Sequence, residues 1–438
     1  RYTTVPGRED RITLGNAVTE WGSWQYCRTG WAWPETFFNE VYLGSDRAGF
    51  SLMTEGARNI RGPKYATMTP AEKDGAVELA VNLVSEPISL EAPLEYSYFY
   101  QTMPLRPEPK DPKVWHISFD PGSAYNGSLP GYSTPEAKEF LGSLYAGHAY
   151  YDLTPDGYPK VTEPDKVKQG IDYYHRLGMN KLVHNLWYGA IADSLPEYKT
   201  FGAEWNALPK FGWSTPNCHL TSACLASAFQ DFHIWCTKGI VDDIGYDGVY
   251  TDATPIQCSN ELHGCGYVGP DGKRKTTLNI LATRNFVKRM YTVLKADGRD
   301  RINFSHSGEG GATGAFNDVR THGEEICWEG KAHYRRITPD YFRAKYAQTE
   351  YGVPYTFYPV FYHKWRAIGE PVPISEIMMM CLAHNITAAV AHVQMEMLPL
   401  WRLFDPWWTS SEFIAYWKPE APVATGDPVN VTASTYLK

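Results

Sequence analysis

Along the first hundred residues, hydrophobic and polar positions alternate with the period of two that is typical of half-buried β-strands. The stretches 48–54, 76–84 and 94–102 show this alternation most clearly, and glycine and proline residues separate them. The pattern predicts a β-sandwich over residues 1–103. A proline-rich segment with several charges, residues 104–112, then predicts a linker.

From residue 113 onward, short apolar stretches alternate with segments of helical period. Strands are expected at residues 114–120, 181–185, 249–252, 301–305, 319–321, 354–360 and 387–393. Helices are expected at residues 165–177, 220–241, 277–296, 339–351 and 375–384. Such alternation predicts a parallel (β/α)8-type TIM barrel, a catalytic domain over residues 113–420. Seven strands can be assigned in this way, and the eighth is expected between Trp187 and Trp213.

The final stretch, residues 430–437, again alternates like a strand. It predicts the start of a truncated β module over residues 421–438. The expected fold class is therefore an α/β TIM barrel that follows an N-terminal β-sandwich and precedes the start of a C-terminal one.

The strongest candidate for chemistry closes the expected strand at residues 249–252. Asp247-Gly248 supplies turn chemistry before this strand, and Asp252 stands at its end. In a (β/α)8 barrel, the carboxyl ends of the strands form the active-site face. Asp252 is therefore expected to act in catalysis, whereas Asp247 is expected to belong to the turn.

A later segment carries three carboxylates within six positions, Glu324, Glu325 and Glu329, beside Trp328. Paired carboxylates from two barrel strands suit the cleavage of a glycosidic bond. One donates a proton to the leaving oxygen, and the other attacks, activates water or stabilises charge. A neighbouring aromatic side chain such as Trp328 raises the pKa of an acid by desolvation. The structural alternative is that these glutamates form ion pairs with neighbouring arginines.

Several other expected strands also end in polar or aromatic residues, which gathers them on the same face of the barrel. These side chains could bind the hydroxyl groups and flat faces of a sugar. For Asp120 the alternative is a helix cap, and for His184 it is a histidine bonded to the backbone. The substrate-binding candidates are Asp120, His184, Asn185, Trp187, His306, Trp328, Glu329, Tyr362 and His392.

The composition narrows the class of partner. Aromatic residues make up 14% of the chain, and many of them lie in stretches rich in glycine and proline, which suits a carbohydrate site or an interface. The formal charge is 41 − 49 = −8, without a basic cluster of the kind that nucleic acids require. No apolar stretch approaches the roughly 20 residues of a membrane span. We expect a secreted, periplasmic or cell-surface protein whose leader has been removed; the sequence does not predict its oligomeric state.

Eight cysteines leave the redox compartment open. Cys258 and Cys265 share one loop and Cys218 and Cys224 share another, so either pair could close a small disulfide loop. Histidines stand beside these cysteines and make a zinc site the alternative, although no Cys-x-x-Cys pair occurs. We therefore expect no metal and no organic cofactor. Buried free thiols are the remaining interpretation for Cys236, Cys327 and Cys381.

Several motifs occur in a recognisable order. They are residues 102–107, residues 247–252, residues 306–308, Gly323-Glu324 with Trp328 and Tyr334, and Trp401 with Asp405, Tyr416 and Trp417. In this order they resemble a bacterial family of glycoside-hydrolase-like proteins related to glycoside hydrolase family 123. The resemblance implies a β-sandwich, then a barrel with glycosidase activity, then a second β-sandwich. Family 123 uses an adjacent Asp–Glu pair, whose nearest counterpart here is Glu324-Glu325.

These observations predict a glycoside hydrolase that degrades a poly- or oligosaccharide. Asp252 is expected to be the nucleophile or charge stabiliser, and Glu324 or Glu325 the general acid/base. One alternative is a polysaccharide lyase, with His306 or Tyr362 as base and Arg320 neutralising a uronate. Another is a glycan-binding protein without catalysis, although binding alone favours aromatics and amides over clustered carboxylates.

Overall fold

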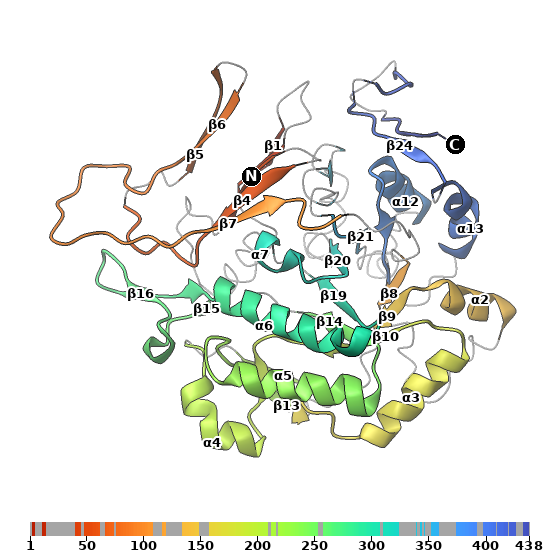
Figure 1. Ribbon diagram of the computed structural model, residues 1–438, viewed down its shortest axis with the longest axis horizontal. Coiled ribbons are helices and arrows are strands. Elements are labelled where there is room, and N and C mark those ends of the chain that lie inside the picture. Colours follow the sequence, from red (N-terminus) through yellow and green to blue (C-terminus); the bar gives the residue numbers. More distant parts are fainter. Residues whose placement is uncertain are drawn as a thin grey trace.

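The computed structural model shows a strand-rich N-terminal region that packs beside a barrel of strands and helices (Figure 1). It describes residues 2–4, 11–14, 40–44, 48–61, 66–73, 76–107, 116–119, 134–148, 157–208, 212–215, 218–252, 257–306, 310–323, 339, 342–343, 346, 352–358, 374–391, 397–408, 410–418, 420–425 and 432–437.

Eight parallel strands form the barrel. They are β8 (Ile117–Phe119), β9 (Ala146–His148), β10 (Leu182–Leu186), β14 (Gly248–Thr251), β19 (Ile302–His306), β20 (Val319–His322), β21 (Tyr355–Phe357) and the two-part strand β22 (Thr387–Ala388) and β23 (Val390–Ala391). Each pairs in parallel with the next in this order. Because β22 pairs with β21 and β23 pairs with β8, the sheet closes on itself. The predicted parallel barrel is therefore present.

The eighth strand is not where the sequence pattern placed it. It is β9, which pairs with β8 on one side and β10 on the other. The stretch between Trp187 and Trp213 holds β11 (Ala190–Ala192) and α4 (Pro196–Trp205) instead. β11 joins a separate antiparallel sheet with β13 (Cys218–Ser222) and β12 (Gly212–Thr215).

Helices lie between most barrel strands and cover the outside of the sheet (Figure 1). They are α2 (Pro135–Ser143), α3 (Pro164–Arg176), α5 (Phe229–Gly239), α6 (Ile280–Leu294), α7 (Gly310–Gly314), α12 (Ile374–Ala383) and α13 (Met397–Trp408). Thr134 caps α2 by accepting a hydrogen bond from the backbone of Ala137, and prolines begin α2 and α3. Three predicted helices, 165–177, 277–296 and 375–384, correspond to α3, α6 and α12.

One predicted helix is wrong in its first half. The segment 220–241 begins in strand β13, and only α5 and the π-helical turn η3 (Ile240–Ile244) after it are helical. β13 pairs with β11 on one side and with β12 on the other. This pairing between strands overrides the helical periodicity of the local sequence. Most of the predicted helix 339–351 lies outside the described residues.

The barrel has two apolar layers because its strands are buried on both faces. Inside it pack Ile117, Ala146, Val183, Tyr250, Ile302, Phe304, Val319, Tyr358 and Ala389. The neighbouring positions, among them Leu182, Leu186 and Val249, pack against the helices. All residues of β10, β14 and β19 are buried. Along each strand, therefore, alternate residues face the barrel axis and the helices.

A long excursion follows β14 before the chain enters α6. It contains the short pairs β15 (Gln257–Cys258) with β18 (Thr277–Leu278) and β16 (Tyr267–Val268) with β17 (Arg274–Lys275). These strands extend from one side of the barrel, beside the N-terminal strands (Figure 1).

The N-terminal region is antiparallel, as its alternating pattern predicts. The strands β1 (Tyr2–Thr4), β2 (Arg11–Leu14), β3 (Glu40–Gly44), β4 (Gly49–Met53) and β7 (Phe99–Met103) form one sheet, and β5 (Ala66–Lys73) pairs with β6 (Ala76–Val81). Met53 and Phe99 pack against Leu278, Ile280 and Ala312 of the barrel. The complete β-sandwich and the domain boundaries stay predictions.

Near the C-terminus, β24 (Glu412–Ile414) pairs with β25 (Thr435–Leu437) in an antiparallel ladder. Whether this ladder begins a further β-sandwich stays a prediction. Within the described part of the chain, none of the helices combines the length and the apolar character that a bilayer crossing requires.

Candidate active site

Asp252 follows the last residue of β14, at the carboxyl end of that barrel strand. Its backbone N–H donates to the carbonyl of Leu186, at the end of the neighbouring strand β10. Tyr250 faces the inside of the barrel. Because side chains alternate along a strand, Asp252, two residues later, faces the same side. The position expected from the sequence is confirmed.

Two donors from two neighbouring strands hold the Asp252 carboxylate. The ring Nδ1 of His306 lies 2.8 Å from Asp252 Oδ1, and the indole Nε1–H of Trp187 donates to Oδ2 at 3.3 Å. The Asp252 side chain keeps 26% of its surface exposed, whereas His306 keeps only 3%. Each oxygen of the carboxylate is thus held by one of these two side chains, and about a quarter of the Asp252 side-chain surface stays exposed.

The His306 ring is itself fixed by two tyrosines of the barrel interior. It stacks on Tyr250 with ring centroids 5.7 Å apart and meets Tyr358 edge-on at 5.8 Å. Because a ring packed in this way cannot rotate freely, its Nδ1 stays directed at Asp252. His306 is among the residues predicted from the sequence, whereas neither tyrosine is. The position of Tyr250, two residues before Asp252 on the same strand face, was the signal that could have identified it.

Trp187 is held by residues beyond the strand ends. Its backbone N–H donates to the Tyr158 hydroxyl at 2.5 Å, and its carbonyl accepts from Tyr158 and from the His233 Nε2–H, 3.1 Å in each case. Burial lowers the pKa of His233 to about 4, so its ring is neutral near pH 7 and donates from Nε2. Tyr158 and His233 were absent from the predicted site, and they act through Trp187.

His184 and Asn185 lie on opposite faces of β10. Asn185 pairs in register with Tyr250 and shares its inward face, and its amide is completely buried. His184 pairs with Val249, and its ring meets Tyr246 edge-on at 5.3 Å. His184 therefore belongs to the layer between strands and helices, while Asn185 faces the barrel axis below Asp252.

Asp247 lies at the other end of the same strand. Its Oδ2 accepts from His175 Nε2 and from the backbone N–H of Leu182, both at 2.8 Å. The hydrogen bond that His175 makes to the Asp247 carboxylate raises the pKa of His175. The next residue, Gly248, has φ +154°, and a Cβ there would collide with the Ile302 carbonyl. Asp247 precedes the strand, as predicted, whereas Gly248 is already the first residue of β14 and not part of the turn before it.

The remaining predicted site residues lie outside the described residues. They are Asp120, Glu324, Glu325, Trp328, Glu329, Tyr362 and His392. The described chain reaches Gly323 at the end of β20, the strand that pairs with β19 so that Thr321 lies beside His306. The structure therefore brings together Asp252, His306 and Trp187 among the predicted residues, with Asn185 below them.

Comparisons with known proteins give weak structural similarity. No protein-family model matches the chain, and no curated protein sequence is similar to it. A noncanonic maltogenic alpha-amylase, AmyB from Thermotoga neapolitana, is 10% identical with a TM-score of 0.47, covering 74% of this chain and 83% of that one. An alpha-amylase from Geobacillus thermoleovorans is 11% identical with a TM-score of 0.44, covering 69% and 81%.

A cycloalternan-degrading enzyme from Trueperella pyogenes is 12% identical with a TM-score of 0.48 and covers 81% of this chain. The chain spans about half, 54%, of the length of that enzyme. The relation to glycoside hydrolase family 123 that the motif order implied is not confirmed and stays a prediction.

Proposed function

We propose that this protein is a glycoside hydrolase that acts on a poly- or oligosaccharide, with Asp252 as the carboxylate that attacks or stabilises the anomeric carbon. The observation that supports this most is the fixed and still accessible Asp252 carboxylate at the carboxyl end of β14. Catalytic groups of (β/α)8 enzymes lie on that face.

The two hydrogen bonds suit a carboxylate that reacts while charged. His306 and Trp187 each direct a nitrogen at one of the two oxygens, which stabilises the negative charge and fixes the plane of the group. A carboxylate held in this way can stabilise the positive charge that develops at the anomeric carbon, or form a bond to it.

We propose Glu324 or Glu325 as the general acid/base. Glu324 follows Gly323 directly and Glu325 comes next, and Gly323 comes directly after β20, the strand next to the one that carries His306. A glycosidase needs a second carboxyl group that protonates the leaving oxygen. Protonation of that oxygen, followed by deprotonation of water, completes the hydrolysis.

Arg320 favours hydrolysis over the lyase alternative. A lyase needs a cation beside the substrate's carboxylate, and Arg320 was the candidate. Its guanidinium is buried over the Tyr355 ring, 5.9 Å from the centroid, and its register partners are Ser305 and Tyr355. Tyr355 packs in the layer toward the helices, on the opposite face of the sheet from His306. A guanidinium in that layer does not reach a substrate above Asp252.

The test is a screen of the purified chain against polysaccharides and aryl glycosides, with Glu324→Gln and Glu325→Gln assayed beside the wild type. We expect new reducing ends without an unsaturated product that absorbs in the ultraviolet. For one of the two glutamates, we expect kcat/KM to fall by about 10²- to 10⁴-fold, the usual contribution of a general acid/base.

The matched control is Glu376→Gln, an exposed carboxylate in α12. It should leave kcat/KM unchanged. Release of an unsaturated product would establish the lyase instead. Sugar binding without any product would establish the glycan-binding alternative.

A further inference from the structure

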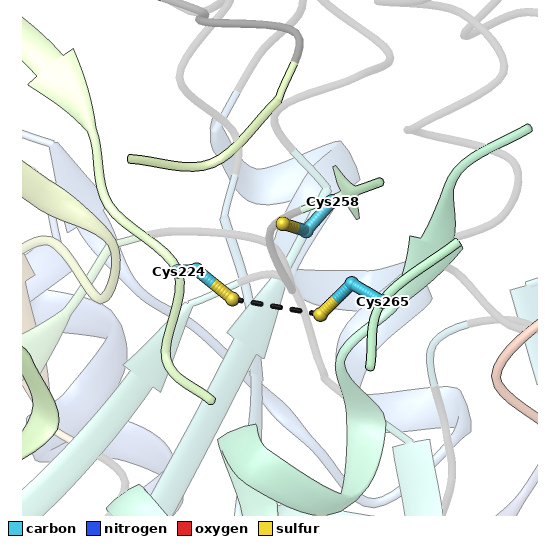
Figure 2. A group of neighbouring side chains, drawn as sticks. All are labelled: Cys224, Cys258 and Cys265. Atoms are coloured by element: carbon cyan, nitrogen blue, oxygen red, sulfur yellow. Dashed lines mark hydrogen bonds between the residues drawn. The ribbon is translucent and has the colours of Figure 1, made fainter. Parts of the chain in front are cut away.

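Three cysteines that lie far apart in sequence meet in one buried cluster. Cys224 follows β13, Cys258 lies in β15, and Cys265 follows the turn η4 (Glu261–His263). Their sulfur atoms lie within 4.8 Å of one another, and the three residues are 0%, 0% and 4% exposed. In Figure 2, Cys224 and Cys265 point toward each other, and Cys258 lies beside them. Of the two pairs that spacing suggested, the fold brings Cys258 and Cys265 together; Cys224 joins them, and all three thiols are free.

The sulfur separation fits metal ligation better than a disulfide. Cys224 Sγ and Cys265 Sγ are 3.7 Å apart. A disulfide requires about 2.05 Å. Two sulfurs bound to one tetrahedral zinc ion at about 2.3 Å lie about 3.8 Å apart. Three sulfurs within 4.8 Å of one another, moreover, leave one thiol unused in any disulfide, whereas a metal ion uses all three.

Two neighbouring N–H groups donate hydrogen bonds to sulfurs of the cluster. The Asn279 Nδ2–H donates to Cys224 Sγ at 2.9 Å, and the backbone N–H of Asn260 donates to Cys258 Sγ at 3.3 Å. Hydrogen bonds of this kind orient thiolate ligands and stabilise their charge. Asn279 is buried, and its Oδ1 lies 3.3 Å from Cys265 Sγ, close enough to complete a fourth ligand position.

Two arginines lie beside the cluster. Arg274 Nη2 donates to the Cys265 carbonyl at 2.5 Å, and Arg58 Nη2 donates to the Gly266 carbonyl at 2.6 Å. Three thiolates and one divalent ion leave a single negative charge beside these guanidinium groups, of which that of Arg274 also pairs with Glu261 at 2.6 Å. Cys265 also lines a surface hollow together with Arg58 and Arg274.

We propose that Cys224, Cys258 and Cys265 bind one structural zinc ion as thiolates. Binding releases the three thiol protons to solvent, and Asn279 Oδ1 or a water molecule supplies the fourth ligand. Soft thiolate ligands in a closed, buried site select zinc over magnesium or calcium. These three cysteines replace the neighbouring histidines as candidate ligands. The proposal also replaces the sequence-based expectation of no metal. His263 directs its Nε2 at the Glu204 carbonyl instead.

The ion would join two excursions that carry the candidate active site. Cys224 belongs to the excursion that leaves β10 after Trp187, and Cys258 and Cys265 belong to the one that leaves β14 after Asp252. A metal ion bound by all three cysteines would tie the two excursions to each other. The zinc site itself does not depend on the proposed glycosidase activity.

The test is metal analysis of the full chain, purified without chelator from zinc-supplemented cells. We expect about one zinc per chain, falling to less than about a tenth in Cys258→Ala. The matched control is Cys381→Ala, an equally buried cysteine in α12 away from the cluster, which should keep its zinc.

Because Cys258→Ala could fail to fold, a second measurement uses the wild type alone. Cobalt(II) exchanged into the site should produce a thiolate-to-metal charge-transfer band and the intense visible bands of tetrahedral cobalt. Absence of zinc together with absence of these bands would overturn the proposal. So would a Cys224–Cys265 disulfide in the intact protein, or copper bound in place of zinc.

Discussion

The two ends of strand β14 carry the same residue type in two different settings. Asp247 precedes the strand and Asp252 follows it, and each carboxylate is bonded to one histidine and one other N–H group. Asp247 binds the backbone of Leu182 and a half-exposed His175, at the end where strands enter the barrel. Asp252 binds two side chains that are themselves packed in place, at the end where strands leave it. Position along the strand thus separates a structural carboxylate from a candidate catalytic one.

The largest effect after loss of Asp252 itself should come from His306. His306→Phe keeps the ring packed against Tyr250 and Tyr358 but removes the nitrogen that faces Asp252 Oδ1. We expect kcat/KM to fall by about 100-fold, because an unanchored carboxylate loses its orientation. His306→Asn retains a donor near the Nδ1 position and should recover about tenfold of that loss. Steady-state kinetics of the two variants on the same substrate measure this difference, and equal losses would contradict a positioning role.

A smaller effect is expected from the second donor. Trp187→Phe removes the indole N–H that bonds Asp252 Oδ2 and keeps most of the aromatic volume. A hydrogen bond to a charged group contributes about 1.5–3 kcal/mol, so kcat/KM should fall at least about tenfold. Trp235→Phe, an exposed tryptophan on α5, is the control and should be neutral. Equal activity of Trp187→Phe and the control would remove Trp187 from the site.

The smallest effect on catalysis is expected at the opposite end of the strand, where stability should change instead. The pKa of His175 is raised by Asp247, so this ion pair stabilises the fold fully below about pH 6.5 and loses its contribution as the pH rises through the raised value. Asp247→Asn should therefore lower the free energy of unfolding more at about pH 5.5 than at about pH 9. Urea unfolding at the two pH values measures this, and an effect independent of pH would show that the ion pair contributes nothing.

Strong apolar strands could be predicted from the sequence, and weak ones could not. β10, β14 and β19 stand out because each carries large or β-branched apolar residues, such as Val183, Val249 and Ile302, at buried positions. β9 was missed because Ala146 and Gly147 have low strand propensity, so only its pairing with β8 and β10 makes it a strand. The helix expected at 220–241 failed for the related reason that sheet pairing holds its first residues.

For the site, the sequence indicated which residue types lie at strand ends but not where they face. His184 and Asn185 looked equivalent, and the parallel register with Val249 and Tyr250 separates them. The cysteine cluster was beyond reach, because Cys224 and Cys265 are 41 residues apart and meet only through two excursions of the barrel. Contacts of this kind depend on tertiary packing and leave no local pattern.

The most direct test compares Asp252→Asn with Asp247→Asn on one substrate of the wild-type enzyme, measuring kcat/KM and the free energy of unfolding for both. For Asp252→Asn we expect kcat/KM to fall by at least about 10³-fold while the unfolding free energy stays within about 1 kcal/mol. For Asp247→Asn we expect nearly normal kcat/KM and a fold weakened by about 1–2 kcal/mol. Full activity of Asp252→Asn with an intact fold would contradict the assignment of the active site to this end of the barrel.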